Sequence, residues 1–205
     1  YLEDRFSLQG NIRKSTVLHQ AKRFGVNFSR AEKVAQYALT LYDNTYGVLH
    51  TDNGEGRELL WAAAMLHSCG QHINLSSYHK HTWYLIRHGE LLGYSQAEHF
   101  MVAAIARYQR KGFPKKRHEA WQSLGDRVQR EIVSQMSILL RLATSLDRRP
   151  EPIIASIKVK VDDRKIKLKL VPERPDQNFA IEEWSLKKTL LAIGEHINAV
   201  IETED

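Results

Sequence analysis

Histidine is the residue type that most directly suggests chemistry in this sequence. There are 10 histidines in 205 residues, and the densest group holds His67 and His72 on either side of Cys69, with His79 and His81 following. Imidazole nitrogens are the commonest protein ligands of transition metals. A lone histidine is more often a hydrogen-bonded structural residue. A group between two apolar segments therefore predicts either a metal site or a buried structural cluster.

A run of basic residues is the second such feature. The segment 107–117 reads RYQRKGFPKKR, in which six of eleven residues are Lys or Arg and none is acidic. Repeated cations suit a linear polyanion, and the guanidinium group of Arg makes bidentate contacts with phosphate. The plainer alternative is a solvated basic loop. The alternating lysines of 158–169 are a weaker candidate, because exposed strand faces are often rich in Lys.

Nucleic acid is a competing partner for the same positive charges. Tyr108 and Phe113 lie among the basic residues and could stack on bases. No helix-turn-helix spacing, zinc finger or aromatic strand motif accompanies them. We therefore expect nucleic acid to be the less favoured partner.

The first 150 residues are predicted to be helical almost throughout. The segments 29–32 and 95–98 have the spacing of a capping box, Ser-x-x-Glu, which marks the start of a helix. Residues 59–66 (LLWAAAML) are apolar on every side, as in a helix surrounded by others. Over 128–146 apolar residues recur at helical period.

The pattern changes at residue 150. Pro150 and Pro152 end the preceding helix and favour extended backbone. Apolar residues and lysines then alternate along two short segments, which predicts a hairpin with one apolar face. The elements expected in this part are the hairpin at 156–170, a third strand at 179–184, a helix at 186–196 and a last strand at 197–201. The predicted fold is mainly α, a helical bundle over 1–150 followed by a small α/β domain over 151–205.

Composition excludes several classes of protein. The chain has 30 Lys+Arg and 24 Asp+Glu, a net charge of +6, and 42% hydrophobic residues, which is typical of a globular protein and not of a disordered one. The one cysteine rules out a disulfide framework and fits a reducing, cytoplasmic location. No stretch approaches the ~20 apolar residues of a membrane span. The sequence begins with Tyr1, so we expect a piece of a longer protein.

Several motifs together resemble one protein family. The segment 63–70 (AAMLHSCG), the basic segment 106–111 (ARYQRK) and the segment 141–148 (RLATSLDR) are similar to motifs of the exopolyphosphatase/guanosine pentaphosphate phosphohydrolase family. Residues 13–24 resemble that family's entry segment between its lobes, and His79-Lys-His81 also fits. The matches occur in order over roughly residues 10–150, and the small α/β part follows in the expected place.

The resemblance implies an HD-domain-like bundle with a degenerate metal motif. Active HD-type phosphohydrolases use an adjacent His-Asp pair, but His67 is followed by Ser68, whose neutral hydroxyl does not replace a carboxylate ligand. The first histidine of the motif is replaced by Arg30, which only donates hydrogen bonds. We therefore expect no metal. The vestigial metal-site positions are His67, Ser68, His79, His81 and Asp147.

The resemblance also implies that catalysis belongs elsewhere. Family members carry an actin-like domain ahead of this region, with phosphate-binding glycine loops. Here the only Gly-x-Gly is Gly54-Glu-Gly56. That preceding domain would release phosphate, with Mg²⁺ as a possible cofactor. We expect no catalytic residue and no cofactor in this chain, and whether it has activity of its own stays open.

The expected function follows from these implications. We expect the chain to bind inorganic polyphosphate or guanosine pentaphosphate and to support a homodimer. The alternatives are a residual metal-dependent HD-type phosphohydrolase and a non-enzymatic module that binds nucleic acid or a nucleotide. The expected phosphate-binding residues are Arg30, Arg107, Arg110, Lys111, Lys115, Lys116, Arg117, Arg148 and Arg149.

Overall fold

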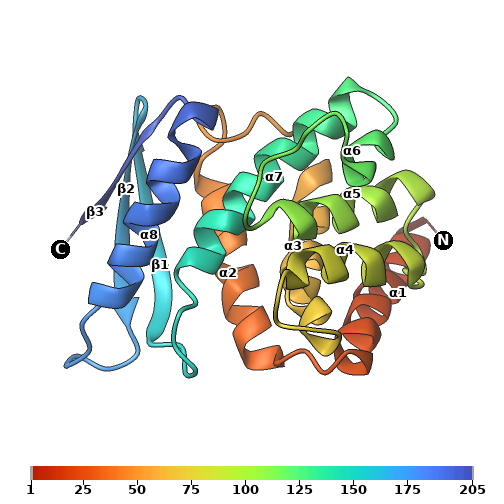
Figure 1. The fold of residues 1–205 in the computed structure, drawn as a ribbon, viewed down its shortest axis with the longest axis horizontal. Helices are drawn as coiled ribbons and strands as arrows, with labels where there is room; N and C mark the ends of the chain where they lie inside the picture. The colour runs from red at the N-terminus through yellow and green to blue at the C-terminus, as the bar shows by residue number, and fades with distance from the viewer. Residues whose placement is uncertain (1, 205) are drawn as a thin grey trace.

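The computed structural model describes residues 2–204, with side chains from residue 10 onward. It confirms a mainly α fold with a small α/β part (Figure 1). The helical elements before residue 150 are α1 (Leu2–Arg23), α2 (Phe28–Asn44), α3 (Glu55–Leu66), the 3₁₀ helix η1 (Cys69–His72), α4 (Tyr78–His88), α5 (Gln96–Tyr108), α6 (Glu119–Gln122) and α7 (Arg127–Ser145).

Helix α3 lies at the centre of the helical part. It packs against α1, α2, α5 and α7. Apart from Trp61, every residue of its apolar segment 59–66 is at most 1% exposed, as expected of a helix surrounded by others. The three consecutive alanines 62–64 allow neighbouring helices to approach α3 closely, because Ala adds little side-chain volume.

One of the two predicted capping boxes is present. At the start of α5, the Ser95 side chain accepts from the Glu98 amide and the Glu98 carboxylate accepts from the Ser95 amide. At the start of α2 the prediction was wrong: the helix begins at Phe28, and the Asn27 side chain accepts from the Arg30 amide at 3.2 Å. Because Asn27 precedes Ser29, it caps the helix first and leaves Ser29 in the first turn.

Helix α7 carries the apolar stripe predicted for 128–146. Met136, Leu139 and Ala143 are fully buried, whereas Val128 is 62% exposed near the start of the helix. The helix contacts α2, α3 and α5 on one side and the C-terminal part on the other. Its C-terminal end therefore lies where the two parts of the chain meet.

The C-terminal part is a three-stranded sheet with one helix. Strands β1 (Ile154–Asp162) and β2 (Lys165–Pro172) form the predicted antiparallel hairpin, with Asp162 opposite Lys165. Strand β3 (Val200–Glu204) pairs in parallel with β2, so the strand order is β1-β2-β3. The last strand thus begins three residues later than the predicted start at 197.

The predicted third strand at 179–184 is wrong. Helix α8 (Ala180–Ile193) begins there and continues into the 3₁₀ helix η2 (Gly194–His196). The residues with high strand propensity, Ile181 and Trp184, are 47% and 59% exposed, and Glu182 and Leu186 are buried instead. Burial at helical spacing, together with Glu182 and Glu183 at the positive end of the helix dipole, favours helix over strand.

Side-chain contacts from α2 join the helical part to the C-terminal part. The Tyr37 hydroxyl on α2 donates to the Ile154 carbonyl, and Lys33 bonds the Ala155 carbonyl at 3.0 Å and Glu173 at 2.7 Å. In Figure 1 the sheet and α8 form the left part of the molecule, and α8 faces α7. The boundary proposed at residue 150 stays a prediction. No helix within residues 2–204 is long and apolar enough to span a membrane.

Candidate anion-binding cleft

A cleft of about 870 Å³ opens between the helical part and α8. One wall comes from the ends of helices α1, α3, α5 and α7 and the segments that follow them, together with the first turns of α2 and α4. The other wall is the face of α8 that carries Trp184, Ser185, Lys188, Thr189 and Ala192. The cleft therefore lies where helix ends gather beside α8.

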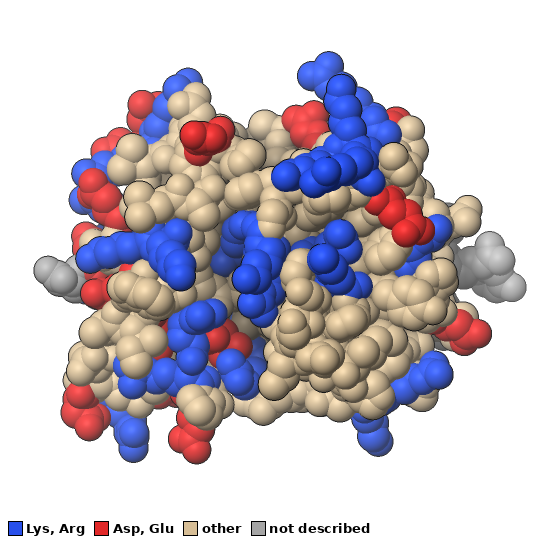
Figure 2. Space-filling model, in the orientation of Figure 1, with Lys and Arg blue, Asp and Glu red and all other residues tan. Residues whose placement is uncertain are grey.

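The cleft is strongly cationic. Its described lining contains one carboxylate, Asp147, against six Lys and Arg side chains. In Figure 2, Lys and Arg gather in the middle of the face, over the junction of α7 and α8, with few acidic side chains among them. The six cations are Arg30, Arg110, Lys111, Arg141, Arg148 and Lys188.

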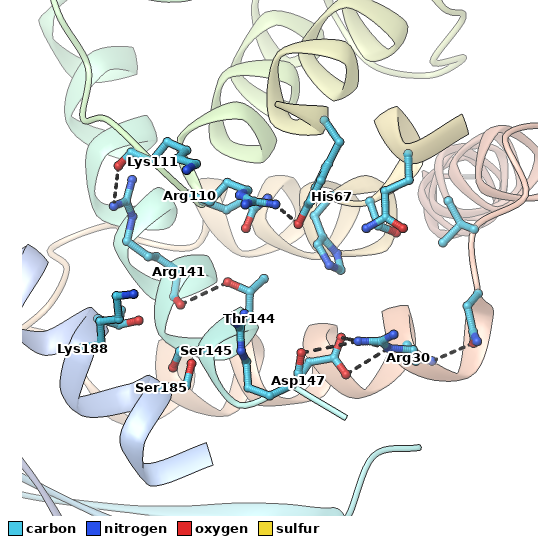
Figure 3. Close-up of a pocket in the computed structure, with 18 of the residues that line it drawn as sticks. Arg30, His67, Arg110, Lys111, Arg141, Thr144, Ser145, Asp147, Ser185 and Lys188 are labelled. Carbon is cyan, nitrogen blue, oxygen red and sulfur yellow. Dashed lines mark hydrogen bonds and ion pairs between the residues drawn. The ribbon is translucent and has the colours of Figure 1, made fainter. Parts of the chain in front are cut away.

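The one carboxylate is already paired. Arg30 donates from Nε and Nη2 to the Asp147 carboxylate at 2.9–3.2 Å, and Nη2 also lies 3.4 Å from the Asp147 carbonyl (Figure 3). The Asp147 side chain is 7% exposed and the Arg30 side chain 35%. Because this pair is neutral as a unit, the other five cations of the described lining have no carboxylate partner within it.

His67 points into the same cleft (Figure 3). Its Nδ1 lies 2.6 Å from the Ala64 carbonyl, a geometry in which Nδ1 donates. Burial lowers the pKa of His67, and the nearby Arg30 guanidinium acts in the same direction. The ring is therefore neutral near pH 7, with Nε2 free to accept a hydrogen bond in this tautomer.

The predicted vestigial metal positions are only partly brought together. His67, Ser68 and Asp147 line the cleft, but His79 and His81 lie on α4 outside it. Burial lowers the pKa of His79 to about 4, with Arg107 and Arg110 adding to the effect.

The donor set in the cleft does not fit a metal. Arg30 occupies the Asp147 carboxylate, and Ser68 offers only a neutral hydroxyl. Among the side chains that the structure describes, those of residues 10–204, no group of three or more from His, Cys, Asp or Glu is placed to hold an ion.

Arg141 is a central residue that the sequence reasoning did not single out as a site. Its side chain is 7% exposed and donates to the carbonyls of Tyr108 at 2.7 and 3.2 Å, Lys111 at 3.0 Å and Gly112 at 3.4 Å. The guanidinium also lies 4.2 Å from the centre of the Phe113 ring. Burial lowers the pKa of Arg141 to about 10, which leaves the group charged near pH 7.

These contacts fix the loop that follows α5. Lys111 adopts a left-handed conformation with φ of 64°, which is uncommon for a residue other than glycine. The carbonyls of 108, 111 and 112 all turn toward Arg141. The side chains of Arg110 and Lys111 are thereby held at the cleft. An arginine between Leu140 and Leu142 in an apolar helix was the sequence signal for this role.

Four of the predicted phosphate-binding residues line the cleft, namely Arg30, Arg110, Lys111 and Arg148. The others do not. Arg107 lies 5.7 Å from the Trp83 ring centre, and Arg149 bonds the buried Glu182 at 2.8 Å. Lys115, Lys116 and Arg117 are exposed on the loop beyond the cleft. Lys188 was missed because only the fold brings α8 beside α7.

The chain matches known proteins over most of its length. The protein-family model described as Ppx/GppA phosphatase, domain III, matches residues 12–189. Three relatives are named guanosine-5'-triphosphate,3'-diphosphate pyrophosphatase. The protein of Pseudoalteromonas atlantica is 28% identical over 89% of this chain, that of Pseudoalteromonas translucida 30% over 75%, and that of Vibrio campbellii 31% over 70%.

The aligned regions make up 37%, 30% and 28% of the lengths of these three relatives. This chain therefore spans only about a third of the proteins to which it is similar. The family model covers helices α2–α7, both strands of the hairpin and most of α8, and so includes every lining residue of the cleft except Ala192. On this match the chain belongs to the Ppx/GppA phosphatase family and corresponds to its domain III.

Proposed function

We propose that the cleft binds the phosphate chain of the substrate of a Ppx/GppA phosphatase. The observation that carries this proposal is the charge of the lining, whose described residues include six cations and one carboxylate that Arg30 already pairs. The ligand class is inorganic polyphosphate or a polyphosphorylated guanosine nucleotide. The names of the relatives, which specify a guanosine with a triphosphate and a diphosphate, support this class.

The buried charge of Arg141 supports an anionic ligand. No carboxylate bonds it among the described residues, and only neutral carbonyls accept its hydrogen bonds. A buried cation without a counter-ion is costly, and an anion nearby lowers that cost. Arg110 and Lys188 carry cations on the two walls, so a phosphate chain between them would be contacted from both sides.

The hydroxyl groups of the cleft would complete the contacts. Ser185 and Thr189 line it and can donate to phosphate oxygens, whereas the hydroxyls of Thr144 and Ser145 already donate to the carbonyls of Arg141 and Leu142. Figure 3 shows Ser145 and Ser185 close to one another, from α7 and α8. The binding would therefore combine charge with neutral donors, and no step of bond cleavage is required of these residues.

Phosphate release is proposed for another part of the parent protein. The donor set of His67, Ser68 and Asp147 does not fit a metal, which argues against a residual metal-dependent phosphohydrolase in this cleft. Under this proposal the domain holds the substrate while an actin-like domain cleaves it. Assembly as a homodimer and a cytoplasmic location belong to the same proposal.

Two adjacent lysines on α8 test the proposal. Lys188 lines the cleft, whereas its neighbour Lys187 is exposed outside it. We expect Lys188→Ala to weaken binding of polyphosphate about fivefold, or about 1 kcal/mol, because it removes one charged phosphate contact. Isothermal titration calorimetry at one fixed salt concentration measures the change.

The matched control is Lys187→Ala, which removes the same charge from the same helix. We expect it to change the affinity less than twofold, since a screened charge outside the cleft contributes little. Equal losses in the two variants would contradict binding in the cleft and would indicate a diffuse surface attraction.

A further inference from the structure

One wall of the cationic cleft carries an exposed tryptophan. Trp184 on α8 lines the cleft, yet its side chain is 59% exposed. Large aromatic residues are usually mostly buried in a folded chain. Lys188, one helical turn later, places its Nζ 5.3 Å from the centre of the Trp184 ring. An accessible indole and a cation thus share one side of the cleft.

Trp184 differs from the other exposed apolar residues of α8. Ile181 and Leu191 are 47% and 86% exposed, but neither lines the cleft. Trp184 is therefore exposed to the cleft, whereas the other two residues are exposed elsewhere on the helix. The Trp184 side chain lies in a pocket otherwise lined largely by charged and polar side chains.

The helical wall also pairs an aromatic ring with a cation. The Arg110 guanidinium lies 4.5 Å from the centre of the Tyr78 ring, and both residues line the cleft. Gln109, which also lines it, places its amide 3.4 Å from the Tyr78 hydroxyl. Aromatic surface and phosphate-binding charge therefore occur together on both walls.

Inorganic polyphosphate has no apolar face, so an exposed indole adds nothing to its binding. A nucleotide has both a phosphate chain and a flat base. We infer that the cleft binds a nucleotide with its base stacked on Trp184 and its phosphates on Lys188 and the arginines of the opposite wall. This inference rests on the proposed function for the phosphate contacts and adds a base site that distinguishes nucleotides from inorganic polyphosphate.

The test compares two ligands that carry the same number of phosphates. GTP and inorganic tripolyphosphate are titrated into the 205-residue chain and into Trp184→Leu, which keeps an apolar side chain but removes the ring. Stacking of one base contributes about 1–3 kcal/mol, so we expect the variant to bind GTP about tenfold more weakly. Its affinity for tripolyphosphate should change less than twofold.

Leu191→Ala is the control, because Leu191 is exposed on the same helix but lies outside the cleft. We expect it to leave both affinities unchanged. In the wild-type chain, GTP but not tripolyphosphate should quench the fluorescence of Trp184, and the quenching should be lost in Trp184→Leu.

The possible outcomes of this test distinguish failure of the base site from failure of the proposed phosphate binding. If Trp184→Leu weakens both ligands equally or neither, the base site is overturned while phosphate binding stands. If the variant changes the sedimentation of the chain but not its binding of GTP, Trp184 belongs to a protein interface and the base site is again overturned. If neither ligand binds the wild-type chain, both the base site and the proposed function fail.

Discussion

Replacing Arg141 with methionine should lower the free energy of unfolding by about 3 kcal/mol. The change removes the donor for three backbone carbonyls, the buried one of residue 108 and the partly buried ones of residues 111 and 112, and hydrogen bonds from a charged group contribute about 1.5–3 kcal/mol each. Methionine fills a similar volume, so packing changes little. Urea denaturation followed by circular dichroism measures the loss.

Arg141→Lys is the informative control for this change. Lysine keeps the charge but lacks the planar fork that reaches several carbonyls at once, so we expect a smaller loss, about 1–2 kcal/mol. Binding of polyphosphate should fall in both variants, because the loop that holds Arg110 and Lys111 is no longer fixed. A methionine variant as stable as the wild type would show that Arg141 does not hold this loop.

Replacing Arg149 with methionine should also destabilise the fold, by about 2–3 kcal/mol. Arg149 is the partner of Glu182, whose side chain is 1% exposed, and its Nε donates to Glu182 Oε1 at 2.8 Å. Loss of one partner leaves a buried charge without its counter-ion, a change that costs about 3–5 kcal/mol for fully buried pairs. The lower value is expected because the Arg149 side chain is 32% exposed. Denaturation with urea again gives the difference.

The double variant Arg149→Met/Glu182→Leu completes the test of this pair. Replacing both charges with apolar groups of similar size is often nearly neutral, so the double variant should recover most of the stability lost in Arg149→Met. A double variant less stable than Arg149→Met would mean that Glu182 is held mainly by other contacts. Polyphosphate affinity should differ little between wild type and double variant, since Arg149 lies outside the cleft.

The helical part could be predicted from sequence because its signals are local. The apolar segment 59–66 and the periodic apolar residues of 128–146 each specify a buried helix without reference to the rest of the chain. The start of α8 could not be predicted in the same way. Its inward face includes Glu182, a residue type that is rarely buried, and only the pairing with Arg149 more than 30 residues away explains that burial.

The candidate site was only partly predictable for a related reason. Arg110 and Lys111 belong to a dense basic run that is visible in the sequence, and both line the cleft. Lys115, Lys116 and Arg117 belong to the same run but lie beyond the cleft, since the hydrogen bonds of Arg141 go to the carbonyls of residues 108, 111 and 112. The wall formed by Trp184 and Lys188 depends on tertiary packing of α8 on α7, which no local pattern shows.

The salt dependence of polyphosphate binding tests the central claim most directly. The cleft variant, Arg110→Glu/Lys188→Glu, reverses one cation on each wall of the cleft. The control variant, Lys160→Glu/Lys187→Glu, makes the same change in net charge at exposed positions outside the cleft. Calorimetric titration of both variants and the wild type at two ionic strengths gives the affinity and its salt slope. We predict that the cleft variant loses affinity on the order of 100-fold and that its slope flattens by roughly 0.7 per lost phosphate contact, by analogy with single-stranded nucleic acid. The control should lose less than threefold and keep the wild-type slope, whereas equal losses and equal slopes in the two variants would contradict binding in the cleft.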